Sequence, residues 1–230
     1  RILLNLKKNV LVDKPIVLDS DQLKILINLA SLNKCFIGEV LNWEYHNQVK
    51  YIKEFIKRNN KFNVIARFTI PLPEEHSFRV NNKEGSGVFW DMNSYLYSTL
   101  RIFTKDNPRL YLSKNIGRFK PQWVKAYLKN SKFSFDGLYG FGFNYQNKLE
   151  LESDKEIIIF DRIYTSEASS PLNVFLITND SFNNYQITDD AFFNYFDKTI
   201  KSIINNDFSY SLEKIENQYS RILNSNHLLK

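Results

Sequence analysis

Three carboxylates in the second half of the chain have the residue types and the spacing that could hold a divalent metal ion. Asp136 lies at the end of one alternating stretch, and Glu150 and Glu152 lie in the next stretch but one. Because alternate residues of a strand share a face, Glu150 and Glu152 point to the same side. Two or three such carboxylates can bind Mg²⁺, which polarises a phosphate and activates water.

This order of an Asp followed by Glu-x-Glu resembles the metal-binding core of the PD-(D/E)XK nucleases, in the form that has Glu in place of Lys. The resemblance covers about twenty residues and implies a metal-dependent nuclease with Asp136, Glu150 and Glu152 as ligands. Lys148 stands on the other side of the Glu pair from the usual order. Glu alternating with Leu is also typical of any solvated amphipathic strand. We therefore expect the three carboxylates to lie too far apart to chelate, and we predict no metal site.

The remaining candidates for catalysis are isolated. His46 and His76 could be acid–base groups, but solvated surface histidines would explain both. No segment has the glycine spacing of a phosphate-binding loop or the G-x-S-x-G pattern of a nucleophile elbow. The single Cys35 excludes an intramolecular disulfide and favours a reducing compartment, so we predict a cytoplasmic protein. We assign no catalytic residue and no cofactor.

Residues 101–132 carry most of the positive charge. They contain nine basic residues and one acidic residue, a net charge of +8, whereas the whole chain carries +6. Aromatic residues such as Tyr111 and Phe119 are interleaved with the basic ones. Basic side chains neutralise phosphates, and aromatic rings stack on unpaired bases. The residues predicted to bind nucleic acid are Arg101, Lys105, Arg109, Lys114, Arg118, Lys120, Trp123, Lys125 and Lys129.

Two other interpretations of the charge pattern stay open. Lysines on helix faces are commonly just solvated, so the basic stretch could be no more than a soluble surface. Residues 144–190 contain nine acidic and three basic residues, a net charge of −6. Such an acidic face could dock a basic protein, as could the helices expected at the C-terminus. A protein-interaction module, such as an inhibitor or an immunity protein, is therefore an alternative.

Length and composition are those of an ordinary globular protein. The chain has 230 residues, of which 43% are hydrophobic and 24% charged, so it can bury a core. No run approaches the roughly 18 apolar residues of a membrane span, and we predict no membrane partner. We predict one domain over residues 1–230, with its weakest join at the polar segment 81–87.

The first half of the chain alternates between extended and helical patterns. Residues 1–18 read as extended, and Asp19 or Ser20 then caps a helix that ends near Asn33. Asp91 is expected to cap another helix, and Pro121 to lie in the first turn of a further one. The other elements expected here are strands at residues 35–37, 64–70 and 110–112, and a helix from about Glu44 to Arg58.

From Phe133 onward the apolar residues recur with a period of two. This alternation, with turns at residues 146–147 and 153–155, predicts an antiparallel meander over about 133–178. Apolar residues at helical spacing over 188–203 and 212–222 then predict a C-terminal helical hairpin. The fold class that follows is α+β, with helices packed on the meander.

From these patterns we predict a non-catalytic α+β domain that binds DNA or RNA through residues 101–132. The alternatives are the metal-dependent nuclease and the protein-interaction module described above.

Overall fold

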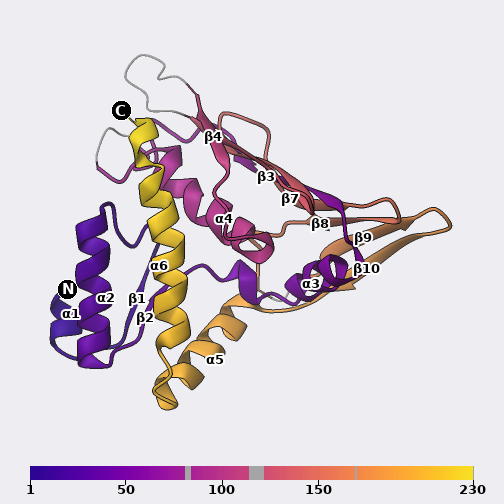
Figure 1. Cartoon of the computed structure of the whole chain (residues 1–230). Coiled ribbons are helices and arrows are strands. Elements are labelled where there is room, and N and C mark those ends of the chain that lie inside the picture. The colour runs from indigo at the N-terminus through magenta and orange to yellow at the C-terminus, as the bar shows by residue number, and fades with distance from the viewer. Residues whose placement is uncertain (81–83, 114–121, 169, 230) are drawn as a thin grey trace.

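The computed structural model describes residues 1–80, 84–113, 122–168 and 170–229 (Figure 1). The helices are α1 (Ile2–Asn5), α2 (Ser20–Asn33), α3 (Gln48–Arg58), α4 (Val88–Phe103), α5 (Ala191–Ile204) and α6 (Ser209–Asn224), with short 3-10 turns η1 (Trp43–Tyr45) and η2 (Asn226–Leu229). The strands are β1 (Val10–Val12), β2 (Ile37–Glu39), β3 (Phe62–Ile70), β4 (Arg109–Leu112), β5 (Trp123–Lys129), β6 (Phe133–Phe141), β7 (Gln146–Glu152), β8 (Glu156–Asp161), β9 (Leu172–Thr178) and β10 (Phe182–Ile187).

The larger sheet has eight strands in the order β10-β9-β8-β7-β3-β6-β5-β4. All its neighbouring strands are antiparallel except β3 and β6, which run parallel with Phe62 opposite Phe133. The helices lie on one side of this sheet, below it in Figure 1, and α4 packs against β5 and β6. The α+β class, with a large and mostly antiparallel sheet, is confirmed.

The prediction of a simple meander over residues 133–178 is wrong. β6 and β7 follow each other in sequence, but β3 lies between them and pairs with both. The alternating pattern located the strands, because alternation reports burial of one face. It contains no information about which strand is the neighbour, and the pairing with β3 joins residues far apart in sequence. The turn expected at residues 146–147 is wrong, since both residues lie in β7. A further strand, β10, pairs with β9 beyond the predicted end of the sheet.

A second, smaller sheet consists of β1 and β2, which run parallel with Leu11 opposite Gly38. The helix α2 connects them. Its N-cap Asp19 accepts a hydrogen bond of 2.7 Å from the backbone of Gln22, as the sequence predicts. α6 packs against α2, α4 and β2, so the last helix joins the small sheet to the helical layer under the large one.

Three local predictions are wrong for identifiable reasons. Residues 2–5 form α1 rather than part of an extended segment. Asp91 does not cap α4, because the helix begins at Val88 and Asp91 lies inside its first turn. Residues 123–129 form a strand and not a helix after Pro121; Val124, Ala126 and Leu128 are buried in alternation, which is the period of a strand.

The core lies between the large sheet and the helices. Ile158 of β8 is 2% exposed and its strand partners are Leu151 and Leu176. We expect Ile158→Ala to lower the free energy of unfolding by about 2–5 kcal/mol, through lost burial and the cavity left behind. The neighbouring Ile159 points to the face without helices, and Ile159→Ala should cost less than about 1 kcal/mol. Urea unfolding measures both, and equal losses would contradict a core on one face only.

No helix in the described part of the chain is both long and apolar enough to span a membrane. The single-domain organisation stays a prediction, and residues 81–83 of its expected weakest join lie outside the described residues.

Candidate functional site

Lys14 lies where β1 ends. β1 and β2 are parallel, so the residues that follow β1 and the last residue of β2, Glu39, meet at the same edge of the small sheet. In sheets of parallel strands, ligands bind at the carboxyl ends of the strands. The structure therefore places a lysine and a glutamate at an edge that such folds use for ligands.

The Lys14 ammonium contacts a buried carboxylate on α4. Its Nζ donates to the backbone oxygen of Asp91 at 2.9 Å and forms an ion pair with Asp91 Oδ1. Arg79 Nε donates to the other oxygen, Oδ2, at 3.2 Å. The side chain of Asp91 is 5% exposed and that of Lys14 is 14% exposed. The carboxylate of Asp91 thus lies between two cations, in the first turn of a helix.

Tyr95 lies one helical turn after Asp91, beside the same ammonium. Lys14 Nζ is 5.4 Å from the centre of the Tyr95 ring. The ring packs edge-on against Phe68 at 4.8 Å. Burial raises the pKa of Tyr95, and the negative charge of Asp91 raises it further. Among the described residues the Tyr95 hydroxyl has no hydrogen-bond partner, so it is available to a ligand.

A buried polar network holds the segment that carries Lys14. The Tyr219 hydroxyl of α6 donates to Glu39 Oε1 and accepts from the backbone N–H of Ile16 at 2.7 Å. Ser94 Oγ and Gln218 Nε2 donate to the two oxygens of Glu39 at 2.9 and 2.6 Å. Burial raises the pKa of Glu39, although these hydrogen bonds oppose the shift. The network ties the backbone next to Lys14 to β2, α4 and α6.

Behind Tyr95 lies a group of fully buried hydroxyls. The Tyr139 and Tyr164 hydroxyls are 3.0 Å apart, and Tyr164 is 3.1 Å from Thr99 Oγ1. Burial raises the pKa of Tyr164 to about 12. These hydroxyls satisfy one another, so their role is to hold the ring of Tyr164 against Tyr95, at 5.8 Å between ring centres.

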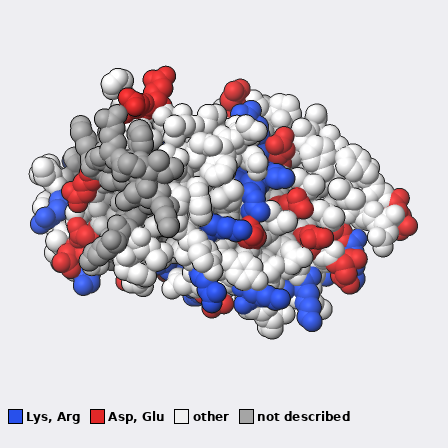
Figure 2. Space-filling view, turned by 90° about the horizontal axis from the view of Figure 1, so that it is seen from above, with Lys and Arg blue, Asp and Glu red and all other residues white. Residues whose placement is uncertain are grey.

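The residues predicted to bind nucleic acid do not share one surface. Arg101 lies on the helical side, where it forms an ion pair with Glu44 and donates to Gln218 at 2.8 Å. Lys125 and Lys129 lie on the opposite face of the sheet, and Lys125 Nζ is 3.7 Å from Asp136. Of the others, Lys105 and Arg109 are exposed, Trp123 is half-buried, and Lys114, Arg118 and Lys120 lie outside the described residues. Over the middle of the face seen in Figure 2, basic and acidic atoms alternate.

The three carboxylates considered as metal ligands lie on two strands that are not neighbours, Asp136 on β6 and Glu150 and Glu152 on β7. Asp136 and Glu150 are both opposite Ile65 of the intervening β3. Their backbones are therefore two strand spacings apart, roughly 9–10 Å, with Ile65 between them. Asp136 instead pairs with Arg67 at 2.8 Å, and Glu152 accepts from Asn63 at 3.3 Å. Within the described residues no cluster of acidic, histidine or cysteine side chains could hold a metal ion.

The sequence interpretation did not single out Lys14, Asp91 and Tyr95 as residues of a candidate site. Lys14 was part of an extended segment and Asp91 was a helix cap, so each had an ordinary structural explanation. Two signals could have found them: a lysine directly after a short apolar strand, and an acid and a tyrosine four residues apart on one helix.

No protein-family model matches the chain, and no curated protein matches it in sequence. Solved structures do match. KijD10, a 3-ketoreductase from Actinomadura kijaniata solved with NADP and TDP-benzene, has a TM-score of 0.86 and 18% identity, over 95% of this chain and 70% of that one. An aldose-aldose oxidoreductase from Caulobacter crescentus, solved with glycerol, has a TM-score of 0.76 and 13% identity, over 97% of this chain and 72% of that one. The chain shares the fold of these oxidoreductases.

This result corrects the functional prediction. The prediction of a non-catalytic domain whose partner is DNA or RNA is wrong, because the solved structures that share this fold include oxidoreductases, with NADP bound in KijD10. The nuclease and the protein-interaction module are withdrawn with it. The physical reason for the error is that a basic stretch of sequence was taken for a basic surface, whereas the fold distributes its residues over two faces of the sheet.

Proposed function

We propose that the chain provides the acid–base residues of an NADP-dependent oxidoreductase that acts on a carbonyl or hydroxyl group of a sugar-type substrate. The observation that carries the proposal is the contact of the Lys14 ammonium with Asp91 and the Tyr95 ring, at the carboxyl end of β1. The shared fold supports it. KijD10 has also been solved with a single lysine and with a single tyrosine replaced, and Lys14 and Tyr95 are residues of those two types.

The residues of this edge fit the reacting end of a nicotinamide cofactor. Lys14 and Tyr95 offer a buried cation and an unbonded hydroxyl at the carboxyl ends of parallel strands, where dinucleotides bind. The nicotinamide, when bound, supplies or accepts a hydride at the substrate carbon. The sequence contains no G-x-G-x-x-G segment, and we assign no residue to the pyrophosphate.

The chain's own residues would control the substrate oxygen. Reduction of a ketone turns C=O into CH–OH, and the oxygen takes up one proton. Tyr95 can donate that proton, because burial and Asp91 raise its pKa and keep it protonated at neutral pH. The Lys14 ammonium stabilises the negative charge that develops on the oxygen. Asp91 and Arg79 position Lys14 and do not need to touch the substrate.

The test is NADPH consumption by the full-length protein with a panel of keto-sugars and nucleotide-linked keto-sugars. Tyr95→Phe is expected to lower kcat about 100-fold, because the proton donor is lost, while the Kd for NADPH stays within about threefold. Because the pKa of Tyr95 is raised, the rate of reduction should stay constant through neutral pH and fall only above the ordinary tyrosine value of 10.0. Oxidation of the alcohol should rise over the same alkaline range.

Tyr127→Phe is the matched control, since Tyr127 is 41% exposed on the face of the sheet without helices. It should leave kcat unchanged. A Tyr95→Phe protein as active as the natural one, or a natural protein that oxidises and reduces none of the substrates, would refute the proposal.

A further inference from the structure

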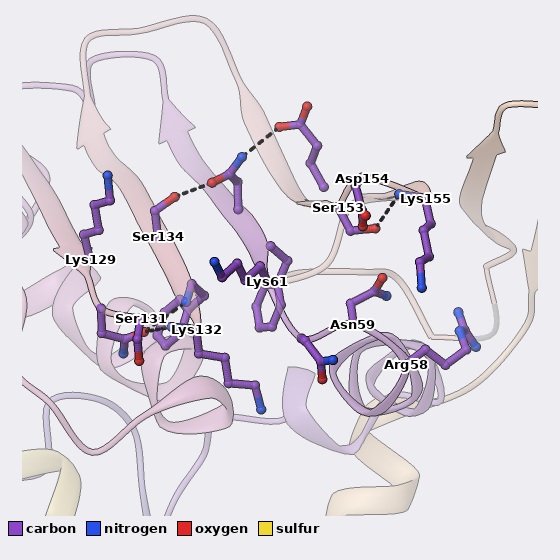
Figure 3. Close-up of a pocket in the computed structure, with 16 residues that line it drawn as sticks. Arg58, Asn59, Lys61, Lys129, Ser131, Lys132, Ser134, Ser153, Asp154 and Lys155 are labelled. Atoms are coloured by element: carbon purple, nitrogen blue, oxygen red, sulfur yellow. Dashed lines mark hydrogen bonds between the residues drawn. The ribbon is translucent and has the colours of Figure 1, made fainter.

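Three turns meet at the far end of the large sheet. They are residues 59–61 between α3 and β3, residues 130–132 between β5 and β6, and residues 153–155 between β7 and β8. Because β7, β3, β6 and β5 are consecutive in the sheet, these turns are neighbours and enclose a depression of about 770 Å³ (Figure 3). Here Phe62, at the start of β3, packs against Phe103, the last residue of α4. Tyr95 packs near the other end of β3, on Phe68.

Each turn brings a lysine to the depression. Lys61, Lys132 and Lys155 come from the three turns and Lys129 from the end of β5, all exposed (Figure 3). Within the described residues none of these four ammonium groups forms an ion pair. The acids that line the depression are Glu152 and Asp154. Like charges that lie near one another repel, so this arrangement stabilises the fold less than the same lysines would if they were spread over the surface.

Side-chain hydrogen bonds fix the backbones of the turns. Asn130 Oδ1 accepts from the N–H groups of Lys132 and Phe133, both at 2.9 Å. Ser153 Oγ accepts from the N–H groups of Lys155 and Glu156 at 3.2 and 3.1 Å. Two of the lysines therefore extend from anchored positions, which lowers the ordering needed on binding.

One wall of the depression is polar and already ordered. Ser134 Oγ donates to Asn63 Oδ1 at 2.6 Å, and Asn63 Nδ2 donates to Glu152 at 3.3 Å, as the dashed lines in Figure 3 show. Arg58 is also held, by Glu156 at 3.1 Å, and is less available to a ligand. The unpaired positive charge of the depression thus belongs to the lysines, beside the acids Glu152 and Asp154.

We propose that this depression binds a small polyanion that carries two or more phosphate groups. A lysine ammonium recognises phosphate as a point charge with rotatable donors. Four such groups, three from separate turns and one from the end of β5, suit several linked phosphates better than one compact anion. The site lies away from Lys14 and Tyr95, and the proposal does not depend on the oxidoreductase activity.

The experiment is calorimetric titration of the full-length protein with inorganic tripolyphosphate at about 150 mM salt, where nonspecific surface attraction is screened. Saturable binding to one site is expected, and inorganic phosphate should bind at least tenfold more weakly. The double variant Lys61→Ala with Lys132→Ala should weaken tripolyphosphate binding by tenfold or more. Its melting temperature should stay the same or rise, because repulsion is relieved, which separates lost binding from lost folding.

The matched control is Lys8→Ala with Lys24→Ala, which removes the same charge from exposed positions in the N-terminal part of the chain. It should change the affinity by less than twofold. An equal loss in both double variants, equal affinity for phosphate and tripolyphosphate, or no saturable binding would each overturn the proposal. Turnover with NADPH should be the same in both double variants, whichever result the titration gives.

Discussion

Lys14→Met is expected to lower kcat of the NADPH-dependent reaction about 1000-fold, with the Kd for NADPH within about threefold. Methionine keeps the length and the apolar stem of the side chain but removes the ammonium that contacts Asp91 and faces the Tyr95 ring. The oxygen of the substrate then develops its negative charge without a cation beside it. Steady-state rates with the best substrate of the keto-sugar panel measure the effect.

Folding has to be separated from catalysis in this variant. Arg79 remains on Oδ2 of Asp91, so the carboxylate keeps one cation and the melting temperature should fall by only a few degrees. Lys14→Arg, which retains the charge, should recover part of kcat. Lys125→Met, at an exposed position on β5, is the control and should leave kcat unchanged. A Lys14→Met protein that is folded and retains more than a tenth of the natural kcat would exclude Lys14 from the reaction.

Glu44→Gln is expected to lower the free energy of unfolding by about 3–5 kcal/mol at neutral pH, because it leaves two buried cations without a charged partner. Glu44 pairs with Arg101 and, at 2.5 Å, with Lys214. The side chain of Glu44 is 12% exposed, that of Arg101 is 20% exposed and that of Lys214 is 11% exposed. Burial alone would raise the pKa of Glu44, but Lys214 and Arg101 lower it further than burial raises it, so the net shift is downward from 4.5.

The sign of the pH dependence follows from that shift. A carboxyl whose pKa is lower in the folded state contributes stability above its unfolded value of 4.5, and the contribution is lost as the pH falls through the folded value. The difference in free energy of unfolding between the natural protein and Glu44→Gln, measured by urea unfolding, should therefore be largest above about pH 5 and become smaller in acid. Glu54→Gln, at an exposed position on α3, should have the same free energy of unfolding as the natural protein at every pH. A Glu44→Gln difference that is constant with pH would contradict the ion-pair explanation.

Elements defined by neighbouring residues could be predicted from the sequence. The helix over Ser20–Asn33 has its cap and its apolar face within one stretch, and β3 alternates from Phe62 to Phe68. The order of strands could not be predicted, because β3 pairs with β6 some seventy residues later. The helix expected after Pro121 failed for a different reason. Val124, Tyr127 and Leu128 also fit helical spacing, whereas the buried residues of the strand are Val124, Ala126 and Leu128.

The candidate site escaped prediction because its residues converge only in the fold. Lys14 and Asp91 are 77 positions apart, and Glu39 and Tyr219 are 180 apart. Each of them, taken alone, fits a strand end, a helix or a buried core position. The charge of residues 101–132 misled for the same reason. Arg101 forms an ion pair with Glu44 on the helical side of the sheet, whereas Lys125 lies on the opposite face, near Asp136.

The hydrogen bond from Ile16 to the Tyr219 hydroxyl joins residues 203 positions apart. It has a consequence for the order of events during synthesis. The lysine-bearing segment is synthesised before α6, which carries the hydroxyl that holds it in place. The candidate site is thus completed only after α6 has been made, and a nascent chain that stops before α6 carries Lys14 without the means to fix it.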